Sequence, residues 1–289
     1  MSYVVDIVTQ GILLGGLYAL FATGLSLVFG VMRLVNLAHG DFIVLAAFSA
    51  LCVISAVPVH PIATLIVVIP FMATLGYLIQ LGLFNRLIGN DPLRPLLVTF
   101  GVSIIIQNVL LGVFSADSHR LSAGAIETQS LDLGTVTVGV FPVIVLACAI
   151  VVTFLLQWLF YSTKLGRKLR ATSDDAEIVG LIGINHLHIF AAASAIAFAV
   201  IGLAGVLMAI RGNFDPFLGP ARLLVAFEAV IIGGLGSFWG TLIGGMIIGI
   251  AQSAGAAIDP AYQGIAGHVF FFLVLLLKPN GLFPKVVHA

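Results

Sequence analysis

Six polar side chains stand inside otherwise apolar stretches of this 289-residue sequence, and their types suit contact with a passing solute. Carboxylate, amide and imidazole groups can bind protons, ions and small polar molecules. Inside a membrane such groups are costly to insert, and they commonly mark a transport path. We therefore take six residues as candidates for the lining or gate of a translocation path: Asn36, His39, Asp41, Gln107, Asn108 and Glu228.

Glu228 has the most demanding position of the six. It lies in the apolar stretch LLVAFEAVIIGG, and no Lys or Arg stands within five residues on either side. It therefore needs a partner on another helix, a water-filled cavity or a bound proton. Either it lines the path or it makes a buried structural hydrogen bond. For His39 we expect an interfacial imidazole near the inner surface, and for Gln107 and Asn108 hydrogen bonds between helices.

The motifs of common enzymes are missing from the sequence. None of the four lysines follows a glycine, so the phosphate-binding pattern G-x-x-x-x-G-K-[ST] is absent. H-E-x-x-H is also absent, no Ser/His/Asp set can be assembled, and Cys52 and Cys148 fall in apolar runs. We expect no enzyme activity, no metal site and no cofactor on this chain. The formal net charge of +0 gives no reason to expect nucleic acid as a partner.

One short segment gathers much of the charge. The chain has 12 basic and 12 acidic residues, and seven of them fall in KLGRKLRATSDDAE, residues 164–177. After the basic half, Thr172, Ser173 and Asp174 are N-cap candidates. Asp174 and Glu177 also have the spacing of a capping box. The pattern predicts a short helix that begins at the acidic half of the segment.

That short helix would carry an apolar stripe formed by Ile178, Leu181 and Ile182. It could lie on lipid headgroups, or it could insert into a groove of a soluble protein. Lipid contact favours a basic polar face, whereas the residues that begin this helix are acidic. The pattern therefore favours a protein partner.

Glycines recur at a spacing of four residues in two parts of the sequence. On a helix this spacing forms a flat face that lets a second backbone approach closely. Such a contact is either a movable interface along a path or static packing. The later set is Gly236, Gly240, Gly244, Gly245 and Gly249, and the earlier set is Gly11 and Gly15 with Gly16 beside them.

Membrane-spanning helices must position these residues. Hydrophobic residues make up 61% of the sequence and charged residues 8%, whereas soluble domains have about 25% charged residues. We expect an all-α polytopic membrane protein, one domain over residues 1–289, with eight full spans, or nine if 223–235 crosses. The apolar runs occupy 7–32, 41–58, 61–83, 96–115, 140–161, 188–210 and 240–258, with shorter runs at 223–235 and 264–278.

The loops indicate how the chain is oriented. Segments 84–95 and 162–187 are basic and two spans apart, so the positive-inside rule places both in the cytoplasm. The acidic loop, about 116–139, would then face outward, and the N-terminus would be periplasmic. Lys278 and Lys285 favour a cytoplasmic C-terminus. This requires an odd number of crossings: nine, or eight with a half-helix pair.

Two weaker patterns concern the loops and breaks. ETQSLDLGTVTVGVF (127–141) alternates polar and apolar residues around Gly134 and predicts a short surface β-hairpin. The hairpin either touches an external partner or caps helix ends. RLVNLAHGDF (33–42) resembles RGNFDPFLG (211–219), and the two breaks are expected on opposite sides. An inverted repeat of this kind would place a substrate site where the broken helices meet.

Four longer segments carry a family resemblance. They are GLYALFATGLSLVFGVMRLVNLAHGDFIVLAAF (16–48), RATSDDAEIVGLIGIN (170–185), AFEAVIIGGLGSFWGTLIGGMIIG (226–249) and KPNGLF (278–283). Together they are similar to the branched-chain amino-acid permeases of bacterial ABC importers. The second resembles the cytoplasmic coupling loop of that family, here about 164–187. ABC importers carry the pattern E-A-A-x-x-x-G in this loop, and its spacing is kept here at Asp174, Asp175, Ala176 and Gly180. Two of these four residues differ from the pattern, and the Leu-Pro that usually follows it is missing.

The resemblance implies a multi-pass subunit of the bacterial inner membrane, similar to the shorter permease of such systems. The implied partners are membrane lipid, a homologous second permease, two ATPase subunits that bind ATP and Mg, and a periplasmic substrate-binding protein. It further implies that the coupling loop contacts the ATPases. The residues concerned are Arg170, Asp174, Asp175, Ala176, Glu177, Ile178, Gly180, Leu181, Ile182 and Asn185.

Several alternatives stay open from the sequence. Similar permeases serve branched-chain amino acids, but also urea, short amides and aromatic or dicarboxylic acids. Selectivity in such systems lies largely with the binding protein. A secondary transporter driven by protons or sodium is an alternative of another class, and it requires intramembrane carboxylates such as Glu228 and Asp41. A structural or assembly protein of the membrane is the third.

Overall fold

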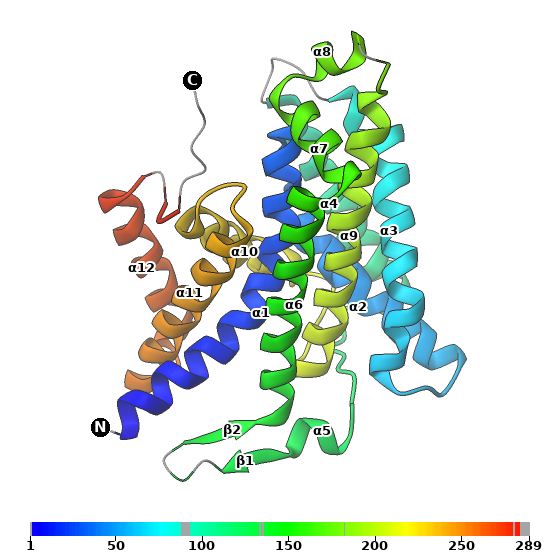
Figure 1. Cartoon of the computed structure of the whole chain (residues 1–289). Helices are drawn as coiled ribbons and strands as arrows, with labels where there is room; N and C mark the ends of the chain where they lie inside the picture. Colours follow the sequence, from blue (N-terminus) through cyan, green and yellow to red (C-terminus); the bar gives the residue numbers. More distant parts are fainter. Residues whose placement is uncertain are drawn as a thin grey trace.

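The structure of the chain, a computed structural model, describes residues 2–87, 93–132, 134, 136–181, 183–279 and 281–283. Long helices form a bundle, and the short elements lie at its two ends (Figure 1). The long helices are α1 (Ser2–Met32), α2 (His39–Ala56), α3 (Leu65–Gly82), α4 (Leu93–Phe114), α6 (Val140–Ser162), α9 (His186–Arg211), α10 (Gly219–Gly233), α11 (Phe238–Ile258) and α12 (Tyr262–Leu277).

Among the described residues, seven helices are long and apolar enough to cross a membrane. They are α1, α2, α3 with its flanking 3-10 turns η1 (Pro61–Thr64) and η2 (Phe84–Arg86), α4, α6, α9 and α11. The apolar helix α12 is shorter, and α10 has 15 residues. The predicted all-α polytopic membrane protein is therefore confirmed. Residues 223–235, which the sequence marks as too short for a full span, lie mostly in α10.

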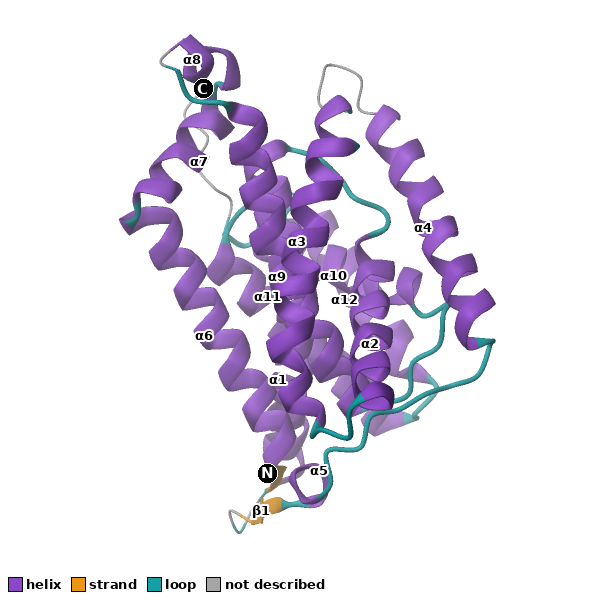
Figure 2. Ribbon diagram, turned by 90° about the vertical axis from the view of Figure 1, so that its right-hand side faces the viewer, coloured by secondary structure: helices purple, strands orange, loops and turns teal. Residues whose placement is uncertain are grey.

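The bundle has two central helices and a rim. Of the most apolar 18-residue stretch of each helix, 83% is buried in α1 and 78% in α9, whereas only 17% is buried in α4. Figure 2 shows α4 at the edge of the bundle. Its outer face exposes apolar side chains such as Leu97, Ile105 and Val113. Since these side chains would be unfavourable in water, the outer face of α4 suits lipid or another membrane subunit.

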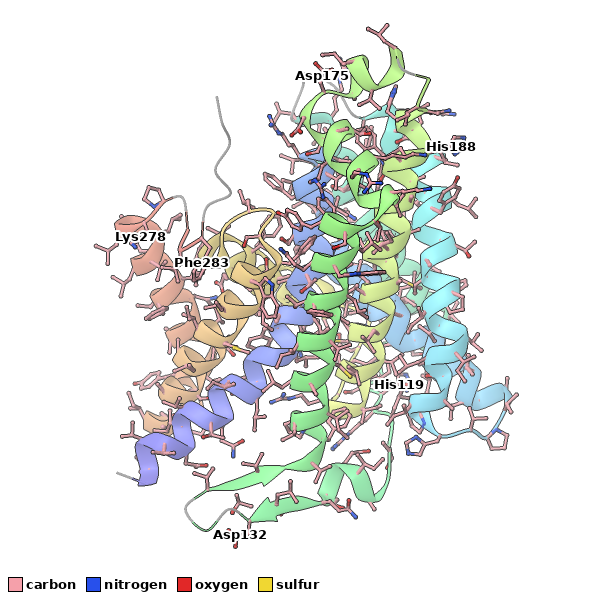
Figure 3. All side chains as sticks on the ribbon, in the orientation of Figure 1. His119, Asp132, Asp175, His188, Lys278 and Phe283 are labelled. Carbon is pink, nitrogen blue, oxygen red and sulfur yellow. The ribbon has the colours of Figure 1, made fainter. Side chains whose placement is uncertain are left out.

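The two ends of the bundle carry different short elements (Figure 1). At one end, beside the start of α1, lie α5 (Ala125–Thr128) and the antiparallel strands β1 (Ser130–Asp132) and β2 (Thr137–Gly139). At the other end lie α7 (Lys164–Asp174) and α8 (Ala176–Leu181). The predicted hairpin is thus confirmed, and the acidic and basic loops lie at opposite ends. Asp132 and Asp175 mark these ends in Figure 3.

Glycines let α1 and α11 pack with their backbones in contact. A Cβ atom on Gly249 would lie 2.2 Å from the carbonyl oxygen of Gly11, and one on Gly15 would lie 2.3 Å from the Cα of Met246. The predicted close approach of a second backbone is therefore confirmed for this pair of helices. Gly245 packs against α1 in the same way.

The other glycines of the later set contact different neighbours. Gly240 and Gly244 pack against α10, where their added Cβ atoms would meet Gly233 and Ala229. For Gly236 the prediction was wrong, because this glycine does not lie on the helix that carries the others. It lies in the turn before α11 with a φ of 79°, a conformation that favours glycine, and its Cα packs near Gly30.

Candidate functional site

Two helix breaks in the described part of the chain resemble each other, one between α1 and α2 and the other between α9 and α10. The Asn36 side chain closes the first break by accepting a hydrogen bond from the backbone N–H of Ala38 at 3.0 Å. Asp215 closes the second in the same way, by accepting from the N–H of Phe217 at 2.9 Å. In both breaks a side-chain turn of this type replaces the helical hydrogen bonds. The weak resemblance between the two segments therefore reflects a shared local structure.

The two breaks meet inside the bundle. A Cβ atom on Gly40 would lie 1.9 Å from the carbonyl oxygen of Gly219, so the backbones of α2 and α10 touch at their first turns. Each glycine stands four residues after the side chain that closes its own break, Asn36 or Asp215. The two breaks therefore lie together, as an inverted repeat would require, while the repeat itself and a substrate site at this contact stay predictions. At both breaks an Asn or Asp is followed four residues later by a Gly, and this repeated spacing is the sequence signal that identifies the contact.

Asp41 lies directly beside this contact. Its side chain is buried, and its Oδ1 accepts a hydrogen bond from Nε2 of Gln107 at 2.9 Å. Gln107 also donates to the hydroxyl of Ser103, 3.1 Å away and one turn earlier on α4. Gln107 thus makes the interhelical hydrogen bond that the sequence predicts. The sequence does not single out Ser103, because a lone serine in an apolar run carries no signal.

Asn108 does not join this cluster. Its side chain is exposed on α4 and donates to the carbonyl oxygen of Ile104, within the same helix, at 2.8 Å. Adjacent residues on a helix point about 100° apart, so Asn108 cannot face Asp41 together with Gln107. The predicted interhelical hydrogen bond from Asn108 is therefore absent from the described residues.

His39 is also placed differently from the prediction. It is 1% exposed, and its Nε2 lies 2.7 Å from the carbonyl oxygen of Phe21 on α1. It is a buried contact between α2 and α1 and not an interfacial imidazole. His39 is buried because α2 begins inside the bundle after the helix break, so its first residue lies away from the surface.

Glu228 finds its partner on α12. Its Oε1 lies 2.5 Å from Nδ1 of His268, and the side chains are 2% and 43% exposed. Of the three possibilities that the sequence leaves open for Glu228, the structure shows the first, a partner on another helix. The sequence does not identify His268 as that partner, because 40 residues separate it from Glu228. Nearby, the Tyr18 hydroxyl donates to Oε1 of Gln252 at 2.6 Å and joins α1 to α11.

Glu228 gives a first prediction. Glu228→Gln keeps a hydrogen-bonding group of the same shape, so assembly of the protein should be unchanged while uptake falls about tenfold or more if the charge lines the path. Glu228→Ala should also lower the free energy of unfolding by about 1–3 kcal/mol, because it removes the buried carboxylate that binds His268. Assembled protein and initial uptake rates are measured together. Equal loss of both in Glu228→Gln would assign the residue a structural role.

Residues 164–187, the predicted coupling loop, differ in detail from the prediction. The basic half is already helical, since Thr163 caps α7 by accepting from the N–H of Gly166 at 3.0 Å. Asp174 is the last residue of α7 and cannot form the predicted capping box. Asp175 caps α8 instead, by accepting from the N–H of Ile178 at 3.0 Å. The extended backbone of Asp175 forms the corner between the two helices and explains the shift by one residue.

Side chains of the loop point in several directions. Leu181 and Ile178 are 86% and 59% exposed, whereas Arg170 turns back to the carbonyl oxygen of Phe160 and stacks over Tyr161. Asn185 caps α9 through the N–H of Leu187. Ala176, Glu177 and Gly180 lie in α8, and Ile182 lies outside the described residues.

Comparison with known proteins gives a consistent match. The family model of the branched-chain amino acid transport system permease component covers residues 7–277. BraD, a high-affinity branched-chain amino acid permease of Pseudomonas aeruginosa, is 28% identical over 94% of this chain and 93% of its own. LivH of Escherichia coli K12 gives the same three values. A probable LivH of Methanocaldococcus jannaschii is 28% identical over 96% and 91%. No solved structure matches the chain.

Proposed function

Because the chain belongs to the branched-chain amino acid transport system permease family, we propose that it is the shorter permease subunit of a bacterial ABC importer. It would form the path for branched-chain or related amino acids together with a second permease. Separate ATPase subunits would supply the energy by binding ATP with Mg. The relatives are transport permeases and not enzymes.

The exposed end of α8 carries this proposal. Leu181 is 86% exposed and Ile178 59% exposed, although the adjacent α7 is strongly charged. An apolar pair held on a short helix outside the bundle gains stability only when a partner covers it. A soluble ATPase that moves with its nucleotide state is a partner that could pass force to the bundle through α7.

The orientation follows from the same proposal. With α7 and α8 in the cytoplasm, the hairpin of β1 and β2 and the start of α1 face the periplasm, where a substrate-binding protein would dock. The membrane is the bacterial inner membrane, and the C-terminus would be cytoplasmic. Exposed apolar faces such as that of α4 would meet lipid or the second permease.

One observation favours a second candidate function. Asp41 Oδ2 and Glu228 Oε2 are buried and have no hydrogen-bond partner in the described part of the chain. Two intramembrane carboxylates of this kind would suit a proton- or sodium-driven transporter. Both carboxylates nevertheless accept a hydrogen bond or ion pair from another helix, and this also fits a structural role in a passive path.

Purification with natural partners separates the two candidates. We expect ATPase subunits to co-purify with the tagged chain. Uptake should stop when ATP is removed and continue when the proton gradient is collapsed. The importer proposal is wrong if no ATPase co-purifies and uptake follows the proton gradient alone.

A further inference from the structure

A cavity of about 300 Å³ lies between α6, the start of α11 and the segment that follows α12. Gln157 and Tyr161, one turn apart on α6, form one wall. Ser237 and Trp239 form the wall at the start of α11, and Phe283 contributes from the segment after α12. Among the described lining residues none is acidic. A negatively charged group in the cavity would therefore meet no repulsion from its walls.

The cavity lies at the level where two spans end. Tyr161 is in the last turn of α6, and Trp239 is the second residue of α11. The chain has two tryptophans, and the other one, Trp158, is exposed one turn before Tyr161. Trp and Tyr prefer the boundary between hydrocarbon and lipid headgroups. Figure 3 shows Phe283, which lines the cavity, in the same half of the bundle as Asp175, which is the cytoplasmic half in the proposed orientation.

A cation lies over the aromatic wall of the cavity. The guanidinium of Arg170 is 5.1 Å from the ring centroid of Tyr161, and it donates to the carbonyl oxygen of Phe160. A guanidinium has several N–H donors, so this bond leaves others for an anion. Asp174, the carboxylate of α7, is at the far end of that helix. The other basic residues of α7 are exposed, and they are Lys164, Arg167 and Lys168.

Two polar groups of the cavity have hydrogen-bond donors to spare. Gln157 is half-buried, and its side chain makes no hydrogen bond within the described part of the chain. The hydroxyl of Ser237 accepts from the N–H of Gly240 at 3.1 Å, and its own proton is not donated to any described residue. An amide and a hydroxyl of this kind suit the oxygen atoms of a phosphate or a glycerol ester.

An apolar stripe leads from the cavity toward the middle of the membrane. Val151, Phe154 and Trp158 are exposed on α6, and their spacing places them on the same face of the helix as Tyr161. A soluble protein cannot reach a stripe within the hydrocarbon layer, and a free phosphate compound would gain nothing from it. Acyl chains would cover it. The arrangement thus suits a molecule with a negatively charged head and a long apolar tail.

We propose that this cavity binds an anionic phospholipid of the cytoplasmic leaflet, with its phosphate at Arg170 and its acyl chains along α6. Basic pockets on the cytoplasmic side of membrane helices bind acidic headgroups in this way. The bound lipid would join α7, which carries α8, to the start of α11. The inference takes only the orientation from the proposed function, and it does not depend on the transported solute.

Lipids that differ only in their headgroup test the site. The purified complex of this chain with its partner subunits is heated in detergent with phosphatidylglycerol or phosphatidylcholine of identical acyl chains. A ligand that binds the folded state raises the unfolding midpoint. We expect phosphatidylglycerol to give the same rise at about fivefold lower concentration, because each basic residue near an acidic headgroup strengthens binding by about that factor. Glycerol phosphate, which has no acyl chains, should give no rise at these concentrations.

Substitutions locate the effect on this chain. Arg170→Gln should remove most of the preference for phosphatidylglycerol, and Arg170→Lys should keep part of it. Gln157→Leu should raise the concentration of phosphatidylglycerol that is needed, because the cavity loses its amide donor. Arg167→Gln, one turn from Arg170 and exposed, should reduce the preference without loss of packing. Arg86→Gln is the matched control, since Arg86 is exposed in η2 and does not line the cavity.

Each outcome bears on the inference. It is overturned if phosphatidylcholine stabilises the complex as well as phosphatidylglycerol, if Arg170→Gln keeps the full preference, or if Arg86→Gln removes as much of it. Equal stabilisation by glycerol phosphate would assign the cavity to a soluble phosphate compound and reject the lipid. If Arg170→Gln does not assemble, an unchanged preference in Arg167→Gln overturns the inference instead. ATP-driven uptake by the same complex tests the proposed function separately, because lipid binding is measured without transport.

Discussion

Leu181→Asp is expected to abolish ATP-driven uptake while the chain still inserts and folds in the membrane. Leu181 is 86% exposed at the end of α8, so the substitution removes no packing within the chain. Exposed substitutions usually change stability by about 0.5 kcal/mol or less. An anchor side chain of an interface contributes about 2 kcal/mol or more when it is truncated. Binding should be weakened further by the new carboxylate than by loss of the side chain alone, because the carboxylate loses its hydration when it is buried in an apolar groove.

The measurement is the amount of ATPase retained on the tagged chain, together with uptake by reconstituted vesicles. Ile178→Asp should act in the same direction, because Ile178 is the neighbouring exposed apolar residue of α8. Leu131→Asp is the matched control, since Leu131 is also exposed but lies on β1 at the opposite end of the bundle. Undiminished ATPase retention by Leu181→Asp would remove α8 from the coupling contact.

Patterns that repeat over a whole helix could be predicted from the sequence. The apolar runs locate the spans because burial in a bilayer imposes length and composition on every residue of a helix. The same holds for the glycines of α11, where a spacing of four places Gly245 and Gly249 against α1. The hairpin around Gly134 was predictable because strand alternation is equally regular.

Details that depend on one local hydrogen bond could not be predicted. Asp175 and not Asp174 caps α8, because both residues have the same chemistry and only the corner after α7 selects between them. His268 could not be assigned to Glu228, since no periodicity links α10 to α12. The sequence predicts His39 at the surface because the first apolar run ends at Met32, and nothing in the pattern shows that the next segment turns back into the bundle.

Gly249→Leu is expected to prevent accumulation of folded protein. A Cβ on Gly249 would lie 2.2 Å from the Gly11 carbonyl oxygen and 2.6 Å from the Gly15 nitrogen. These neighbours are backbone atoms of α1, so no side-chain rotation can relieve the contact. Overpacking in a core commonly costs about 1–3 kcal/mol where side chains can adjust. Here the helices themselves must separate, and the loss should exceed that range.

Gly101→Leu is the matched control for this substitution. Gly101 lies within α4, and apart from the neighbouring backbone of α4 no atom lies within 4 Å of an added Cβ. Both variants add the same apolar side chain to a membrane helix, so they differ mainly in what the side chain meets. The yield of folded protein and its thermal unfolding in detergent are compared with the wild type. Equal yields of the two variants would show that α1 and α11 do not pack as closely as described.

Gly249→Ala separates the two roles that the glycine contact could have. A single methyl group still clashes with the Gly11 carbonyl oxygen, but a small displacement of α11 can accommodate it. If the contact is static packing, stability and uptake should fall together. If α1 and α11 slide along each other during transport, the methyl group fixes one position, so uptake should fall while the folded complex is retained. We expect the first result, because on both helices the glycines lie directly against backbone atoms of the other helix, and close packing of this kind resists displacement. These glycines are Gly11, Gly15, Gly245 and Gly249.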